Sequence, residues 1–151
     1  MALQTIAGHR VGEDVDDLKA WLRELPGCPP ITHTLAATCH HPAHGGEPSI
    51  WFYVEGDPAT GIARRRCVGC ATVRSVLDSE ERWTFPPMWA CRNCQNSLCE
   101  VAFGVHAEPA DDGAAVTWLA VVVRCVECGR FDGVTDLAVP GLGLDEVGRR
   151  V

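Results

Sequence analysis

Three cysteine pairs, each with two residues between its members, carry the clearest chemistry in this sequence. They are Cys67 with Cys70, Cys91 with Cys94, and Cys125 with Cys128. A two-residue loop lets both sulfurs of such a pair face one metal ion at about 2.3 Å. The motif Arg-Cys-Val-x-Cys also occurs twice, at residues 66–70 and 124–128. This repetition predicts two units of the same construction, each closed by its own ion.

The second half of the chain contains a complete set of ligands. The cysteines from Cys91 to Cys128 have the spacing C-x2-C-x30-C-x2-C, and four thiolates so spaced can surround one tetrahedral zinc ion. Over residues 89–139 this arrangement resembles the zinc-ribbon superfamily with its rubredoxin-like knuckles. The resemblance implies a structural zinc site on a small β-sheet.

The first unit must draw half of its ligands from the His-rich stretch at residues 38–46. Residues 41–45 have the Cys-Pro-x-Cys-Gly form of a zinc-ribbon knuckle with histidines in place of both cysteines. Cys39 competes with them, because a thiolate is the stronger zinc ligand. We expect two of Cys39, His41 and His44 to join Cys67 and Cys70, which gives two zinc ions per chain. The alternative is a solvated His-rich loop beside an unrelated cysteine pair.

The elements around the cysteine pairs are short and rich in β-branched residues, in the order strand, turn, strand, knuckle, strand. The sequence therefore predicts a small β-rich, metal-stabilised fold of two tandem three-stranded zinc ribbons. We expect an N-terminal helical segment at 1–30, a first ribbon at 31–82, and a linker with the second ribbon at 83–151. Within the first segment, apolar residues of 14–25 recur at helical spacing, so an amphipathic helix should pack on the first ribbon.

Composition limits the class of protein. The chain has 151 residues, of which 46% are hydrophobic and 22% charged, as in soluble globular proteins. The longest apolar run, 114–123, is far shorter than the roughly 20 residues of a membrane helix. The N-terminus lacks the features of a secretory signal. We therefore expect a cytoplasmic protein without a membrane partner, whose thiols stay reduced.

Charge narrows the class of partner. The net charge is −7, and four thiolates around a divalent ion add −2, so the protein is a poor general binder of nucleic acid. Arg64, Arg65 and Arg66 form a local basic stretch that could contact RNA, DNA or an acidic protein. On a strand, adjacent side chains point to opposite faces, so a solvated edge strand is the expected interpretation.

Large aromatic residues gather between the two units. Trp83, Phe85, Met88 and Trp89 flank the stiff dipeptide Pro86-Pro87. They fill the seam between the ribbons or form an exposed docking surface. Because interface hot spots favour Trp and Arg, the candidate partner-binding residues are Trp83, Trp89 and the stretch Arg64, Arg65 and Arg66.

These features favour a non-catalytic zinc-binding module that acts through protein–protein, or ribonucleoprotein, contacts in a cytoplasmic assembly or regulatory complex. One alternative is a rubredoxin-like electron-transfer protein with iron in the four-cysteine site, although the glycine that follows a rubredoxin knuckle is replaced by Gln95. A zinc deaminase or hydrolase at the mixed site fits less well, because Glu47 lies one residue too far from His44 for an H-x-E motif. No catalytic residue is predicted. Cys99 is expected to be a buried core thiol, and the role of Cys28 stays open.

Overall fold

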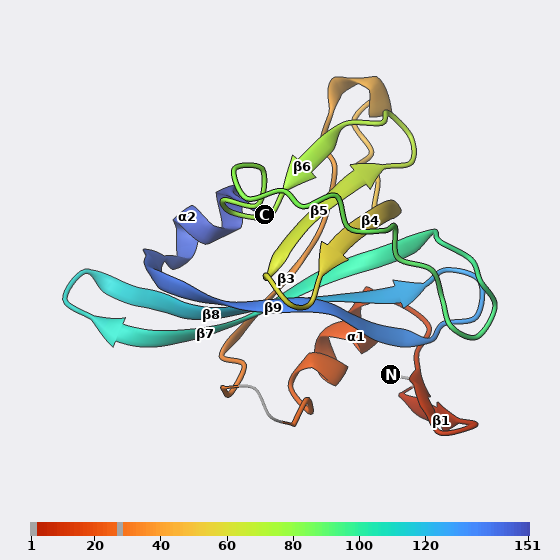
Figure 1. The fold of residues 1–151 in the computed structure, drawn as a ribbon, viewed down its shortest axis with the longest axis horizontal. Helices are drawn as coiled ribbons and strands as arrows, with labels where there is room; N and C mark the ends of the chain where they lie inside the picture. Colours follow the sequence, from red (N-terminus) through yellow and green to blue (C-terminus); the bar gives the residue numbers. More distant parts are fainter. Residues whose placement is uncertain (1–2, 27–28) are drawn as a thin grey trace.

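The computed structural model describes residues 3–26 and 29–151 of the chain. Figure 1 shows a strongly curved β-sheet with a helix against one face and a second helix near the C-terminus. The N-terminal hairpin consists of β1 (Gln4–Ile6) and β2 (His9–Val11). The helical elements are α1 (Val15–Leu22), the 3-10 turn η1 (Pro42–His44) and α2 (Leu144–Arg149). The main sheet contains β3 (His33–Ala36), β4 (Phe52–Asp57), β5 (Ile62–Cys67), β6 (Val73–Ser75), β7 (Cys99–Ala110), β8 (Gly113–Cys125) and β9 (Phe131–Gly143).

The main sheet joins strands from both predicted ribbons. Its order is β6-β5-β4-β7-β8-β9, with antiparallel neighbours, and β3 pairs with β7 beside β4. The β4-β5-β6 and β7-β8-β9 meanders meet where Phe52 pairs with Cys99. A topology of two separate three-stranded ribbons is therefore not confirmed. The division of the chain at residues 30 and 82 stays a prediction.

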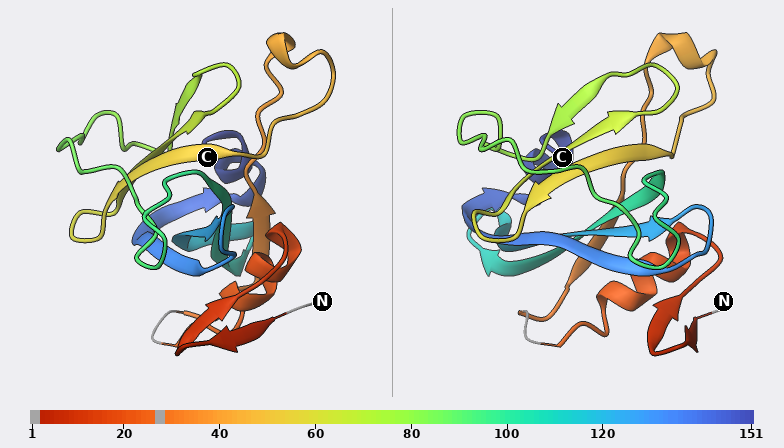
Figure 2. Two further views of the ribbon diagram at one scale, coloured as in Figure 1. Left: turned by 90° about the vertical axis from the view of Figure 1, so that its right-hand side faces the viewer. Right: turned by 45° about the vertical axis from the view of Figure 1, so that its right-hand side comes forward.

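The sheet folds over itself, so that the β4–β5 hairpin covers β9, as Figure 2 shows. The Thr135 hydroxyl on β9 donates to the main-chain oxygen of Asp57 at 2.9 Å. At Gly61 an added Cβ would lie 2.6 Å from the Cβ of Leu137, and the backbone φ is +76°. Only glycine allows this close approach in the left-handed region. The main core lies between the two halves of the folded sheet and draws buried side chains from both.

Strand β8 is buried on both faces. Leu119 and Val121 face the main core, whereas Ala120 and Val122 belong to a second cluster with α1. A strand covered on both faces has a nearly continuous apolar sequence, which explains the apolar run at residues 114–123. The helix packs on β7 most of all, and on β3 and β8 to the same extent. The expectation that it packs on the first ribbon therefore holds for β3, whereas β7 and β8 belong to the predicted second ribbon.

Helix α1 begins with a side-chain cap. The Asp14 carboxylate accepts a hydrogen bond from the main-chain N–H of Asp17 at 2.9 Å, which satisfies one free donor of the first turn. Leu18 and Leu22, one turn apart, are fully buried. The helix therefore presents one apolar stripe to the sheet, as its amphipathic sequence predicts.

The aromatic segment between the two meanders lies across β4. The Trp89 main-chain N–H donates to the oxygen of Val54 at 2.7 Å, and its indole N–H donates to the Asp132 carboxylate at 3.0 Å. Trp89 thus ties β4 to β9 and fills the seam between the two halves. Phe85, in contrast, is 83% exposed.

Within residues 3–26 and 29–151, no helix combines the length and the apolar character that a membrane crossing requires.

Candidate metal centres

The three cysteine pairs form turns with the same backbone hydrogen bonds. The N–H of the first cysteine donates to the carbonyl five residues later, and its carbonyl accepts from the N–H four residues later, at 2.8–3.0 Å. The residue after each second cysteine has a left-handed backbone, with φ of +60° at Ala71, +66° at Gln95 and +78° at Gly129. The knuckle therefore forms without glycine at two of these positions, and the missing glycine at Gln95 does not prevent it.

The second centre brings together all four cysteines that its spacing predicts. The Sγ atoms of Cys91 and Cys128 are 3.6 Å apart, and those of Cys94 and Cys125 are 3.5 Å apart. All four sulfurs lie within 4.8 Å of one another. A tetrahedral ion with metal–sulfur bonds of about 2.3 Å would separate its ligands by about 3.8 Å. The four thiols are thus arranged to hold one metal ion.

Main-chain contacts position the two turns of the second centre. One turn precedes β7 and the other joins β8 to β9. Cys99 and Cys125 are register partners in the ladder between β7 and β8, and the N–H of Val126 donates to the oxygen of Leu98 at 3.2 Å. The end of the β7–β8 ladder therefore sets the distance between the two knuckles.

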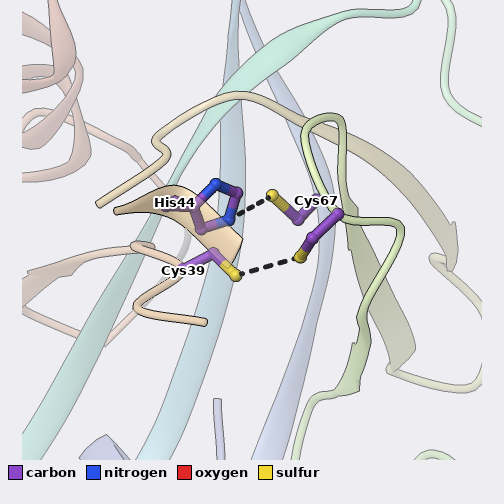
Figure 3. A group of neighbouring side chains, drawn as sticks. Cys39, His44 and Cys67 are labelled. Atoms are coloured by element: carbon purple, nitrogen blue, oxygen red, sulfur yellow. Dashed lines mark hydrogen bonds between the residues drawn. The ribbon is translucent and has the colours of Figure 1, made fainter. Parts of the chain in front are cut away.

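The first centre contains Cys39, His44, Cys67 and Cys70. In Figure 3 the His44 ring points toward the sulfur of Cys67. His44 Nε2 lies 3.4 Å from Cys67 Sγ, and the Sγ atoms of Cys39 and Cys70 are 3.6 Å apart. With bonds of about 2.3 Å to sulfur and about 2.05 Å to nitrogen, tetrahedral geometry gives a nitrogen–sulfur separation of about 3.6 Å. The three thiols and one imidazole fit a single ion.

A closed loop carries the first two ligands of this centre. Cys39 pairs with Ser49 through two main-chain hydrogen bonds of 2.8 and 3.0 Å. The loop between them contains η1, which ends at His44, and Gly45 follows with φ of +64°. This loop replaces the C-x-x-C turn of the other knuckles.

The other two histidines of the loop lie outside the cluster. The Nδ1 atom of His41 accepts a hydrogen bond from the N–H of Ala43 at 3.1 Å and caps η1. The Nε2 atom of His40 lies 2.9 Å from the Thr38 hydroxyl. Of the three candidates Cys39, His41 and His44, the cluster therefore contains Cys39 and His44, and His41 lies outside it, where its ring nitrogen caps the turn that ends at His44.

Hydrogen bonds favour the thiolate form of one cysteine in each centre. Burial opposes ionisation of Cys67, but bonds from the Ser49 hydroxyl and from the N–H groups of Cys70 and Gly69 lower its pKa to about 6. Burial likewise opposes ionisation of Cys128, whereas the Asn93 side chain and the N–H of Arg130 help to lower its pKa to about 7. Such thiols supply a ready thiolate to a metal ion.

The remaining cysteines have different positions. Cys99 is fully buried, and its thiol donates to the main-chain oxygen of Phe52 at 3.3 Å. Burial raises its pKa well above the usual range. The prediction of a core thiol is confirmed for Cys99. Cys28 lies outside the described residues.

The basic stretch does not form a solvated edge, because β5 lies between β4 and β6. The Arg64 guanidinium pairs with Glu55 at 2.9 Å and lies 4.1 Å from the centre of the Trp83 ring. Arg65 is buried, and burial together with the neighbouring Arg74 lowers its pKa to about 10. Arg66 is the exposed member of the three.

An exposed apolar group beside the first centre was missed in the sequence. Ile50, Trp51 and Val68 are 42%, 44% and 41% exposed, and the N–H of Val68 donates to the oxygen of Trp51 at 3.1 Å. We call these three residues the Trp51 patch. The sequence signal for Trp51 is the apolar run 50–54, in which Phe52 and Val54 are buried and alternation turns Trp51 outward. Ile50 and Val68 have no such signal.

Comparison with protein-family models, curated proteins and solved structures gave no match to this chain. The two clusters of cysteine and histidine are nevertheless consistent with zinc-binding modules. The likeness to the zinc-ribbon superfamily rests on these clusters alone.

Proposed function

We propose that this chain is a non-catalytic zinc-binding module that acts through protein–protein contacts in a cytoplasmic assembly or regulatory complex. The observation that carries the proposal is the composition of the two clusters, each of which offers four protein ligands to one ion. Structural zinc sites are closed in this way, whereas catalytic zinc sites leave one position for water or substrate.

The ligand chemistry supports zinc as the ion. Structural zinc is commonly held by four cysteines, or by three cysteines and one histidine, and the two clusters have these two compositions. In the first centre, Cys39 provides the fourth donor, which in a zinc deaminase would be a water molecule. The first centre is therefore proposed as structural, and both ions as contributors to folding rather than to a reaction.

The Trp51 patch supports a protein partner. It combines a tryptophan with two aliphatic side chains on the surface next to a rigid metal knuckle, and tryptophan is enriched among interface hot spots. A nucleic-acid partner has less support, because Arg65 is buried and Arg64 pairs with Glu55. This leaves Arg66 as the exposed cation of the basic stretch.

Metal analysis of protein purified without added metal tests the first half of the proposal. We expect two zinc ions per chain and a colourless solution. A red protein with iron in one centre would instead support the electron-transfer alternative, because four thiolates bind iron as well as zinc.

A matched pair of substitutions tests the second half. Trp51→Ser should weaken capture of a defined protein partner at least tenfold while both zinc ions remain bound. Ile6→Ser is the control, because Ile6 is 55% exposed on the separate N-terminal hairpin. Equal capture by the wild type and by Trp51→Ser would remove the patch from the proposal.

A further inference from the structure

The β4-β5-β6 meander has one buried face and one open face. Phe52 and Cys67 belong to the main core, and successive side chains of a strand point to opposite sides, so Tyr53 and Arg66 face outward. Arg66 pairs with Tyr53 on β4 and with Val73 on β6. These three residues form a row across the outer face, in which Arg66 is the middle member.

Exposed apolar side chains gather at this outer face. Trp51 and Val68 stand beyond the pair of Phe52 with Cys67, and the N–H of Val68 donates to the oxygen of Trp51 at 3.1 Å, so the Trp51 patch borders the row. Within residues 3–26 and 29–151, seven large apolar side chains are exposed. All except Ile6 belong to the meander or to the segments that adjoin it, namely Ile50, Trp51, Val68, Val73, Phe85 and Met88. Such a concentration of exposed apolar side chains marks an interaction site.

The aromatic linker covers the other end of the outer face. The Arg64 guanidinium pairs with Glu55 at 2.9 Å and lies 4.1 Å from the centre of the Trp83 ring. Met88 is the register partner of Glu55. The linker and an internal ion pair therefore occupy the face at Arg64, whereas Arg66, two positions further along β5, is exposed. The open part of the face extends from Arg66 to the Trp51 patch.

Arg66 enables this surface to select a partner by charge. Among the residues that the structure describes, its guanidinium makes no ion pair, since the ion pairs between arginine and acidic side chains involve Arg10, Arg64, Arg82, Arg124 and Arg150. Water solvates the exposed group, so it does not destabilise the free chain. A carboxylate of a partner can take the place of this water and accept two parallel hydrogen bonds from the guanidinium fork. An amine in the same position would be repelled.

We propose that the outer face of the meander binds a peptide segment of a partner protein in which one carboxylate lies between apolar side chains. The carboxylate pairs with Arg66, and its apolar neighbours cover Trp51, Val68 and Val73. This inference rests on the proposed protein-contact function and names the chemistry of the segment that the module recognises.

The charge of the whole chain limits the segment to an isolated carboxylate. A net charge of −7 repels a strongly acidic partner at long range, so the apolar contacts supply the affinity and the ion pair supplies the specificity. Single-stranded nucleic acid fits this face less well. It requires a groove with several cations along its backbone, whereas Arg64 is already paired with Glu55.

The experiment uses the complete metal-loaded chain, immobilised, and three synthetic peptide pools. The pools are identical except for the central residue, which is Glu, Gln or Lys, and the flanking positions are mixtures of Leu, Val, Phe and Trp. The retained peptides are quantified by mass spectrometry. We expect the Glu pool to be retained about threefold more than the Gln pool, as for an ion pair near the surface, and the Lys pool least of all.

Charge reversal makes the test specific. Arg66→Glu should invert the preference, so that the Lys pool is retained more than the Glu pool, and the exposed position of Arg66 preserves the fold, as circular dichroism and metal content will show. Arg23→Glu is the control, because it changes the net charge equally at an exposed position that ends α1, and it should keep the preference for Glu. Trp51→Ser should abolish retention of the Glu pool.

Different failures have different meanings. Equal retention of the three pools, or the same preference in Arg66→Glu and Arg23→Glu, would overturn the inference. If retention then still depended on Trp51, the proposed protein-contact function would stand without it. Tighter binding of a single-stranded RNA oligonucleotide would assign the face to nucleic acid, and a wild-type dimer that Trp51→Ser dissociates would assign it to a second copy of the chain; either result would also overturn the inference.

Discussion

Replacement of Phe52 by alanine should destabilise the whole protein rather than its first half. Phe52 is fully buried, stands where β4 meets β7 opposite Cys99, and has the Arg65 guanidinium 4.7 Å from its ring centre. Truncation of a buried phenylalanine costs about 3–5 kcal/mol. For a chain of this length, each kcal/mol lowers the unfolding midpoint by about 2–4 °C. We therefore expect a decrease of roughly 6–20 °C.

The assay combines thermal unfolding by circular dichroism with release of metal to a colorimetric chelator. Because both halves of the sheet share one core, the variant should show one transition at which both ions are released together. The control is Phe85→Ala, whose side chain is 83% exposed and which should change stability by less than about 0.5 kcal/mol. Two separate transitions, with the second centre retaining its ion at the wild-type temperature, would refute the single shared core.

Three further substitutions and conditions test individual parts of the structure. Cys94→Ser should release one ion and leave the other bound, because the two clusters share no ligand; native mass spectrometry checks this, and retention of both ions would exclude Cys94 as a ligand. Gly61→Ala should lower the thermal midpoint more than Gly113→Ala does, since both residues have positive φ but only at Gly61 would a Cβ collide, 2.6 Å from that of Leu137. The lowered pKa of Cys67, about 6 against an ordinary value of 9.0, means that its thiolate stabilises the metal-free fold fully above pH 9. This contribution is lost as the pH falls through 6, so urea unfolding of metal-free protein should have a lower midpoint at pH 5 than at pH 9, and equal midpoints would contradict the pKa shift.

The metal clusters were predictable where they depend on local chain geometry. A C-x-x-C turn is fixed by six consecutive residues, so the spacing alone brings Cys91 and Cys94 to one side and Cys125 and Cys128 to the other. The mixed site depends on a longer loop. Which histidine joins this site depends on the pairing of Cys39 with Ser49. No local pattern in the sequence predicts that contact.

The joining of the two meanders was not predictable from spacing. It depends on the pairing of Phe52 with Cys99, two residues far apart in the sequence whose register is set by long-range packing. One signal was nevertheless present: the uninterrupted apolar character of most of 114–123 is typical of a strand that is covered on both faces. An isolated ribbon of three strands has no second layer to cover it.

The non-glycine knuckles show why the proposed ions matter for the fold. Ala71 and Gln95 hold left-handed backbones with φ of +60° and +66°, and each costs about 1–2 kcal/mol relative to a right-handed conformation. Structural zinc contributes about 10–16 kcal/mol, which exceeds this combined cost severalfold. With metal the strained turns persist, and without it they lose the interaction that compensates their strain. The stability of the first knuckle, and of the Trp51 patch that rests on it through Val68, should therefore be lower in metal-free protein than in metal-loaded protein.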